Sequence, residues 1–378
     1  MKTNAPLVKT LEALAFRPVR DLAGSEDQFL RRLQDALEVQ GNPAVFLPSH
    51  SGESRKNRSE EPPCRPADSR GLPGGLVNLN PRLPTLVLPD LHTRRRELFQ
   101  ILTLPRDDTG KTVLQELDEG KLNLVCVGDA LHSEGSGAAG RWRTAWREYL
   151  GGFRPSPEMD REMNAGLALE EMIFLLQNRF PRNFFFLKRN HENITCEEGR
   201  GNHPFGKYAA EGEMVFGYLE HRFGKDVIKE LYRWEHALPL MARGPWYLIS
   251  HAEPGRAFSP EEVIDAARRP EVVEGLTWTR RWEAEESAVR DNLGRFISPW
   301  LAGRALYWAG HTALAEPVWY GEENLVLFHG SGPLRGWILP PEPPDLTREG
   351  DSPRGVRESA GLEELFQTLS AEGDGPDS

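Results

Sequence analysis

The chain has 378 residues, of which 39% are hydrophobic and 27% charged, the composition of a globular protein long enough for one large domain or two ordinary ones. Its 57 acidic residues outnumber its 46 lysines and arginines, and the net charge of -11 opposes sequence-independent binding to nucleic acid or anionic membranes. We therefore expect neither as a partner, while the oligomeric state stays open.

The cysteines and the N-terminal residues favour the cytoplasm. Cys64, Cys126 and Cys196 lack the paired spacing of a disulfide framework, so we interpret them as reduced thiols. The first residues contain no apolar core of the signal-peptide type, and no segment approaches the roughly 20 apolar residues that span a bilayer. We expect a cytoplasmic protein.

Residues 1–48 are predicted to form a helical extension. Ser25 and Gln28 make a capping box, and Gly41 provides the stop signal. Between them, apolar residues recur at helical spacing: Phe29, Leu30, Leu33 and Leu37. One helix is expected here, packed on the main domain.

The segment 49–83 is crowded with serine, proline, glycine and charge, and it is predicted to be a flexible linker or surface loop. The tail, residues 341–378, is rich in proline at its start. The spacing of Leu362, Leu365, Phe366 and Leu369 predicts a short closing helix there, followed by disordered residues.

The main domain, residues 84–340, contains six short apolar runs that end abruptly in polar residues and indicate buried strands. They are residues 85–90, 123–129, 183–190, 245–251, 305–311 and 324–330. Apolar residues at helical spacing over 169–180, and a second helical stretch over about 207–235, separate some of them. Strands that alternate with helices predict an α/β domain with a largely packed sheet.

The first five runs all end in residues that bind metals. These are Asp90 with His92 just beyond it, then Asp129, Asn190, His251 and His311. Because the runs are spaced for crossover connections, their ends can meet at one edge of a sheet. Carboxylate, imidazole and carboxamide donors together suit two divalent ions, Mn or Fe first and Zn as an alternative, with Asp129 as the bridging carboxylate.

Five segments, PDLHTRRREL, VGDALHSEG, LKRNHENI, ISHAEPG and AGHTA, resemble in order and spacing the signatures of the calcineurin-like metallophosphoesterases, over roughly residues 85–335. The chain is most similar to the branch of protein serine/threonine phosphatases and diadenosine tetraphosphate hydrolases. Ala313, which replaces the second histidine of the G-H-x-H motif, agrees with that branch. The resemblance implies a four-layer-type β-sandwich of mixed sheets flanked by helices, with the catalytic domain at 84–340.

The resemblance also implies a ligand set and a reaction. The first metal would be held by Asp90, His92 and Asp129, and the second by Asp129, Asn190, His251 and His311. A hydroxide that bridges the metals would hydrolyse a phosphoester or phosphoanhydride, and His191 would protonate the leaving group. The expected substrate is a phosphorylated small molecule or a phosphoprotein.

The chain departs from the family where phosphate is normally gripped. The D-R-G of the second motif is replaced by His132, Ser133 and Glu134, so the orienting acid and the phosphate-binding arginine are both missing. His132 either replaces that acid or is a surface residue. New phosphate contacts are sought among four arginines, since a guanidinium matches phosphate oxygens: Arg280, Arg189, Arg94 and Arg95.

Two other interpretations remain. The C-terminal part of the domain also resembles diadenosine tetraphosphatases, which makes a nucleotide pyrophosphohydrolase an alternative. The missing D-R-G makes a catalytically impaired metal-binding regulator another. His329 also ends a strand, but it falls where related phosphatases carry no ligand, so a structural or substrate-facing role is expected for it.

Overall fold

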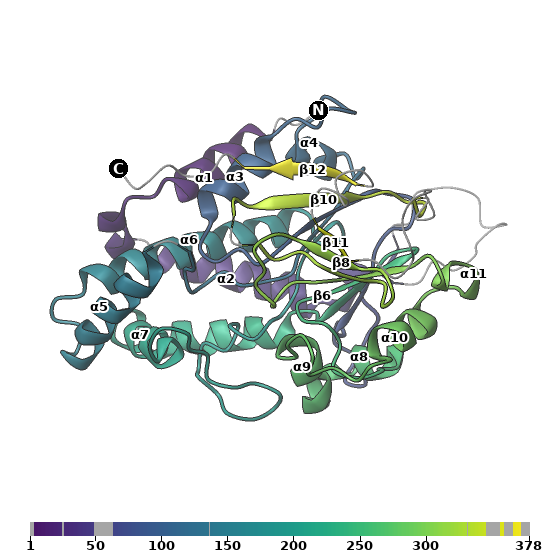
Figure 1. Cartoon of the computed structure of the whole chain (residues 1–378). Helices are drawn as coiled ribbons and strands as arrows, with labels where there is room; N and C mark the ends of the chain where they lie inside the picture. The colour runs from purple at the N-terminus through teal and green to yellow at the C-terminus, as the bar shows by residue number, and fades with distance from the viewer. Residues whose placement is uncertain are drawn as a thin grey trace.

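The computed structural model describes residues 4–24, 26–48, 63–135, 137–330, 332–344, 356–358 and 366–371, and these form two mixed β-sheets (Figure 1). The five-stranded sheet has the order β12 (Gln367–Ser370), β10 (Arg335–Leu339), β2 (Thr85–Leu88), β3 (Asn123–Cys126), β4 (Phe184–Phe186). The seven-stranded sheet has the order β1 (Leu76–Asn78), β5 (Met241–Arg243), β6 (Tyr247–Ser250), β7 (Leu306–Ala309), β9 (Leu325–Leu327), β8 (Val318–Tyr320), β11 (Val356–Glu358).

Alternating side chains show that the two sheets pack face to face. In β2, Val87 belongs to a core cluster shared with Ile249 of β6 and Trp308 of β7, in the other sheet. Its neighbours Leu86 and Leu88 belong to a different cluster, on the outer face of their sheet. Successive residues of a strand point to opposite faces, so both faces of β2 are buried and the strand is apolar throughout.

Helices cover the outer face of each sheet. The face of the five-stranded sheet packs against α1 (Ala5–Ala15), α2 (Glu26–Gly41), α3 (Arg95–Thr103), α4 (Val113–Asp118), α5 (Ala138–Leu150), α6 (Pro157–Arg179) and α7 (Glu211–Ala237). The other sheet packs against α8 (Pro260–Ile264), α9 (Pro270–Thr277) and α10 (Ala288–Phe296), with α11 (Pro299–Ala302) at their end (Figure 1). This order of layers, helix, sheet, sheet, helix, confirms the predicted fold class.

All six predicted strands are present, and they are divided between the two sheets, whereas the strand pattern taken alone indicated a single sheet. β2, β3 and β4 run parallel in the five-stranded sheet, whereas β6, β7 and β9 run parallel in the seven-stranded one. An apolar run buried on both faces does not reveal which sheet it joins, so the sequence could not separate them.

The N-terminal region contains more structure than predicted. The expected helix is α2, which packs on α6 and α7, while α1 and the 3-10 turn Val19–Gly24 were not predicted. Ser25, of the proposed capping box, lies outside the described residues.

The prediction of a linker over 49–83 is wrong for its second half. Residues 49–62 lie outside the described part, but from Pro63 onward the chain is packed. β1 pairs parallel with β5, and Arg65 is 2% exposed, with its guanidinium donating to the carbonyls of Pro73, Gly74 and Ala237. Proline, glycine and charge misled the prediction because here they build turns around a buried arginine.

The prediction of a closing helix in the tail is also wrong. Phe366 precedes β12, which pairs antiparallel with β10 in register Trp337↔Thr368. Leu362 and Leu365 lie outside the described residues. Without β12, the edge of β10 would expose unpaired backbone groups. Strand pairing with that edge is more favourable than the helix that the spacing of a few apolar residues indicates.

Among the described residues, we find no helix with both the length and the apolar character needed to cross a membrane.

Candidate active site

The parallel strands of both sheets deliver the six predicted ligands to one centre. The His92 Nδ1 atom is 3.1 Å from Asp129 Oδ2, and His251 Nδ1 is 3.4 Å from Asp90 Oδ1. His251 Nε2 is 3.0 Å from both Asn190 Oδ1 and His311 Nδ1. Residues from two sheets and some 220 positions of sequence therefore share a single cluster.

The donor atoms of this cluster suit divalent cations. Buried atoms without a hydrogen-bond partner within the described structure are Asp90 Oδ1, Asp129 Oδ1 and Oδ2, His251 Nδ1 and His311 Nε2. Such atoms are costly unless something binds them, and a mixed carboxylate and imidazole set fits Mn, Fe or Zn.

Burial keeps the imidazoles in the form that binds metals. Burial lowers the pKa of His251 to about 4 and holds the pKa values of His92 and His311 well below the usual value. Burial alone would raise the pKa of Asp90, but His329, Arg189 and His251 together hold it well below its usual value. Neutral histidines and an ionised aspartate are the states in which these side chains coordinate metals.

Three of the predicted ligands have left-handed backbone conformations: His92 (φ 43°), Asp129 (φ 64°) and His311 (φ 56°). Each follows a strand closely. This region of φ is unfavourable for residues with a side chain and is found mostly where the surrounding structure and function demand it. Here it turns the side chain out of the strand direction toward the centre.

Glu192 links two of the loops that carry predicted ligands. Its Oε1 atom accepts from the backbone N–H groups of Asp129 (3.2 Å) and Ala130 (3.3 Å), and its Oε2 atom accepts from that of Arg189 (3.1 Å). Glu192 is 4% exposed, so these bonds are shielded from water. The glutamate thus fixes Asp129 relative to the loop that carries Asn190.

Arg189 brings a buried positive charge to the cluster. Its guanidinium contacts the Asp129 carboxylate and lies 3.9 Å from Asp90 Oδ1, and the residue is 1% exposed. It also lines the cleft described below, and its role as a clamp for substrate phosphate stays a prediction.

We expect Arg189→Ala to bind Mn²⁺ or Zn²⁺ more tightly, by roughly tenfold or more, because a buried positive charge beside Asp129 is removed. Titration of metal-free protein by calorimetry measures the dissociation constant. Arg290→Ala, which removes an exposed guanidinium on α10 outside the cleft, is the matched control. Unchanged or weaker binding by the Arg189 variant would show that the guanidinium does not compete with the ions.

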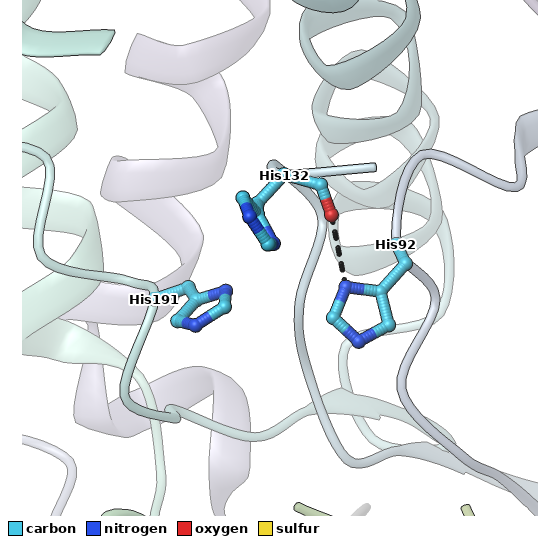
Figure 2. Close-up of side chains that lie close together, drawn as sticks. All are labelled: His92, His132 and His191. Carbon is cyan, nitrogen blue, oxygen red and sulfur yellow. Dashed lines mark hydrogen bonds between the residues drawn. The ribbon is translucent and has the colours of Figure 1, made fainter. Parts of the chain in front are cut away.

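His191 lies between an aromatic ring and a second histidine. Its ring stacks on Phe205 at a centroid distance of 4.7 Å, and its Nδ1 atom is 3.0 Å from Asp129 Oδ1. Figure 2 shows the rings of His92, His132 and His191 around a common space, with His92 Nδ1 2.9 Å from the carbonyl oxygen of His132. Because a carbonyl only accepts, His92 Nδ1 carries the proton, and Nε2 keeps the lone pair that can bind a metal.

His132 is not a surface residue, so that alternative is wrong. It is 2% exposed and stacks on Trp142 and Tyr208, at centroid distances of 5.2 and 6.0 Å. Its ring lies edge to face with that of His191 at 4.8 Å, and its Nε2 atom is 3.5 Å from Oε1 of the buried Glu211. His132 does not line the cleft described next, which argues against direct contact with substrate.

A cleft of about 590 Å³ opens onto the cluster. Its walls carry the cations Lys207, Arg280 and Arg281 and the aromatic residues Phe205, Trp278 and Trp282. Arg281 is held by Glu323 at 2.6 Å and lies over the Trp282 ring, whereas Arg280 is exposed at the wall.

Arg94 does not support its predicted role. Its guanidinium donates to the backbone carbonyls of Leu91, Gly332 and Asp90, and the residue is not part of the cleft wall. Its donors are used to hold the chain that carries Asp90.

Sequence reasoning missed several wall residues. Lys207, Phe205 and Trp282 come from connecting segments, and Glu134, which pairs with Lys207 at 2.6 Å, was seen only as a lost glycine of the D-R-G motif. No spacing signal marks such residues, because their positions depend on how the segments cross the strand ends.

Two mixed sheets flanked by helices, with a polar centre at the strand ends, agree with the fold that the motif resemblance implied. The solved structure of a protein serine/threonine phosphatase from Saccharomyces cerevisiae with similarity to human phosphatase PP5 matches 93% of this chain and 91% of its own, with a TM-score of 0.52 and 12% identity. A cold-active protein-tyrosine phosphatase of a psychrophile Shewanella matches 78% of this chain and 83% of its own, with a TM-score of 0.36 and 12% identity.

The first of these two similarities supports the fold. The sequence matches no protein-family profile and no curated protein at a significant level. The activity must therefore be argued from the site itself.

Proposed function

We propose that the chain is a dinuclear-metal-dependent phosphoester hydrolase. The observation that carries the proposal is the meeting of the six donor residues at the strand ends of two sheets, with buried donor atoms that have no hydrogen-bond partner in the described structure. A structural core gains nothing from so many unpaired polar atoms, whereas a pair of cations would satisfy them.

Each residue has a role in this proposal. Asp129, central in the cluster, would be shared by both ions. Asp90 and His92 would complete one position, and Asn190, His251 and His311 the other. Bound divalent ions would supply Lewis acidity and make a water nucleophilic near neutral pH.

His191 would protonate the leaving oxygen, since it lies beside the ligands and faces the cleft. His132 contacts its ring edge to face, and the charge of Glu211 lies behind His132. We propose that this pair positions His191 in place of the missing acid. Arg280, exposed on the cleft wall, would bind the substrate phosphate.

Hydrolysis assays of metal-reconstituted protein test the proposal. Protein loaded with Mn, Fe or Zn would be offered an aryl phosphate, phosphoseryl and phosphotyrosyl peptides, and diadenosine tetraphosphate. Release of phosphate from the first three supports a phosphatase, and cleavage only of the last supports the pyrophosphohydrolase, which the exposed Trp282 ring favours as a stacking surface for a base. Two bound metals without turnover of any substrate would instead indicate a regulator.

We expect His191→Gln to lower kcat by about 10²–10⁴-fold on alkyl phosphates, because an alkoxide leaves poorly without a proton. An aryl phosphate with an acidic leaving group should lose much less. Steady-state rates on the two substrate types measure the difference, with metal content checked by elemental analysis. Equal losses on both substrates, or none, would contradict the assignment.

A further inference from the structure

His329 reaches the same centre from a strand that the motifs did not use. It follows β9, which lies parallel to β7, the strand that precedes His311. The His329 Nδ1 atom is 3.4 Å from Asp90 Oδ2, and its ring centroid is 5.3 Å from that of His92. Ligand atoms of Asp90, His92 and His329 all lie within 4.8 Å of one another, the spacing of groups that hold one ion.

The Nδ1 atom of His329 has no hydrogen-bond partner in the described part of the chain. His329 is 5% exposed, and this atom is buried and unpaired, as are Asp90 Oδ1 and His251 Nδ1 in the same cluster. A residue that only filled space would not need an unpaired nitrogen facing an aspartate.

We propose that His329 is a protein ligand of the first metal, beside Asp90 and His92. The inference rests on the proposed metal pair and adds one imidazole to the ligand set that the motifs imply. Ala313, in the position where a second histidine would follow His311, also lines the cleft and offers no donor. An imidazole thus reaches the first position from β9.

This assignment has a consequence for metal choice. An additional nitrogen donor favours Zn²⁺ and Fe²⁺ over Mg²⁺ and Mn²⁺, because affinity for imidazole rises along that series. His329 should therefore make the first position selective for Zn²⁺ and Fe²⁺. Removing the ring should bring the affinities for Zn²⁺ and Mn²⁺ closer together.

Metal binding, rather than activity, tests the proposal. Metal-free wild-type protein and the His329→Gln and His329→Ala variants would be titrated with Zn²⁺ and with Mn²⁺ by calorimetry. We expect the variants to weaken Zn²⁺ binding at one of the two positions by about 10–100-fold or more, with a smaller loss for Mn²⁺. His221→Ala, which removes an exposed histidine on α7, is the matched control and should bind both metals as wild type does.

A spectroscopic count of the imidazole ligands uses wild-type protein, so it does not depend on whether a variant folds. Pulsed electron paramagnetic resonance of Mn²⁺ in wild-type protein labelled with ¹⁵N-histidine should show two coupled imidazoles for the first position, where the motif-derived set predicts one. Two bound metals with one coupled imidazole there, or unchanged Zn²⁺ affinity in both variants, would overturn the assignment and leave the proposed function standing. Wild-type protein that binds no divalent metal would overturn both.

Discussion

Asp129→Asn is expected to abolish hydrolysis, with kcat/KM falling by roughly 10³-fold or more, equivalent to about 4 kcal/mol of barrier. The carboxylate lies at the middle of the site, 3.1 Å from His92 Nδ1 and 3.0 Å from His191 Nδ1. The amide keeps the volume but removes the negative charge that two cations would share. It also leaves Arg189 beside a neutral group.

The same variant should bind fewer than two metals per chain, measured by elemental analysis after dialysis. Its fold should persist, because the bonds to Glu192 come from the backbone N–H groups of Asp129 and Ala130 and not from the carboxylate. Asp265→Asn, at a half-buried aspartate that accepts from Ser69, is the control. Full metal content with undiminished turnover in Asp129→Asn would remove the basis of the proposed chemistry.

The candidate ligands could be predicted because they depend on local signals. A buried strand is apolar, its end is marked by the first polar residues, and parallel strands place those ends at one edge. No further signal was needed to predict Asp90, Asn190 and His251 as candidate ligands. The two-sheet arrangement did not alter the outcome, since both sheets present the same ends to the same space.

The remaining features could not be predicted because they depend on packing between distant segments. Arg189 replaces a glycine of the motif, and only the structure shows that its guanidinium, at the cleft, contacts the Asp129 carboxylate and lies 3.9 Å from Asp90 Oδ1. His329 stands at a strand end like the others, but its approach to Asp90 requires that β9 lie next to β7. β12 was mistaken for a helix because strand pairing with β10 is a contact that sequence spacing does not encode.

The second large effect that we expect is a loss of stability, and it concerns the N-terminal region. Glu171 of α6 is 1% exposed and forms ion pairs with both Arg17 and Arg32, whose side chains are 8% and 13% exposed. Arg17 also donates to Asn164 Oδ1 at 2.9 Å. One buried carboxylate therefore balances two guanidinium groups and joins the N-terminal helices to the core.

We expect Glu171→Gln to lower the free energy of unfolding by about 3–5 kcal/mol, because removing one partner of a buried ion pair leaves an uncompensated charge. Here two guanidinium groups lose their partner, while the side-chain volume is unchanged. Urea unfolding followed by circular dichroism measures the loss. Limited proteolysis should also cut the variant earlier near residue 20, because the helices before α3 would separate more readily.

Glu12→Gln, at an exposed glutamate of α1, is the matched control and should change stability by less than about 0.5 kcal/mol. A loss below about 1 kcal/mol in Glu171→Gln would mean that the neutral amide satisfies both arginines, and that apolar packing of α2 on α6 and α7 holds the N-terminal region. The larger loss is expected because an amide cannot neutralise either buried charge, and both guanidinium groups would have to reach water by separating α1 and α2 from α6.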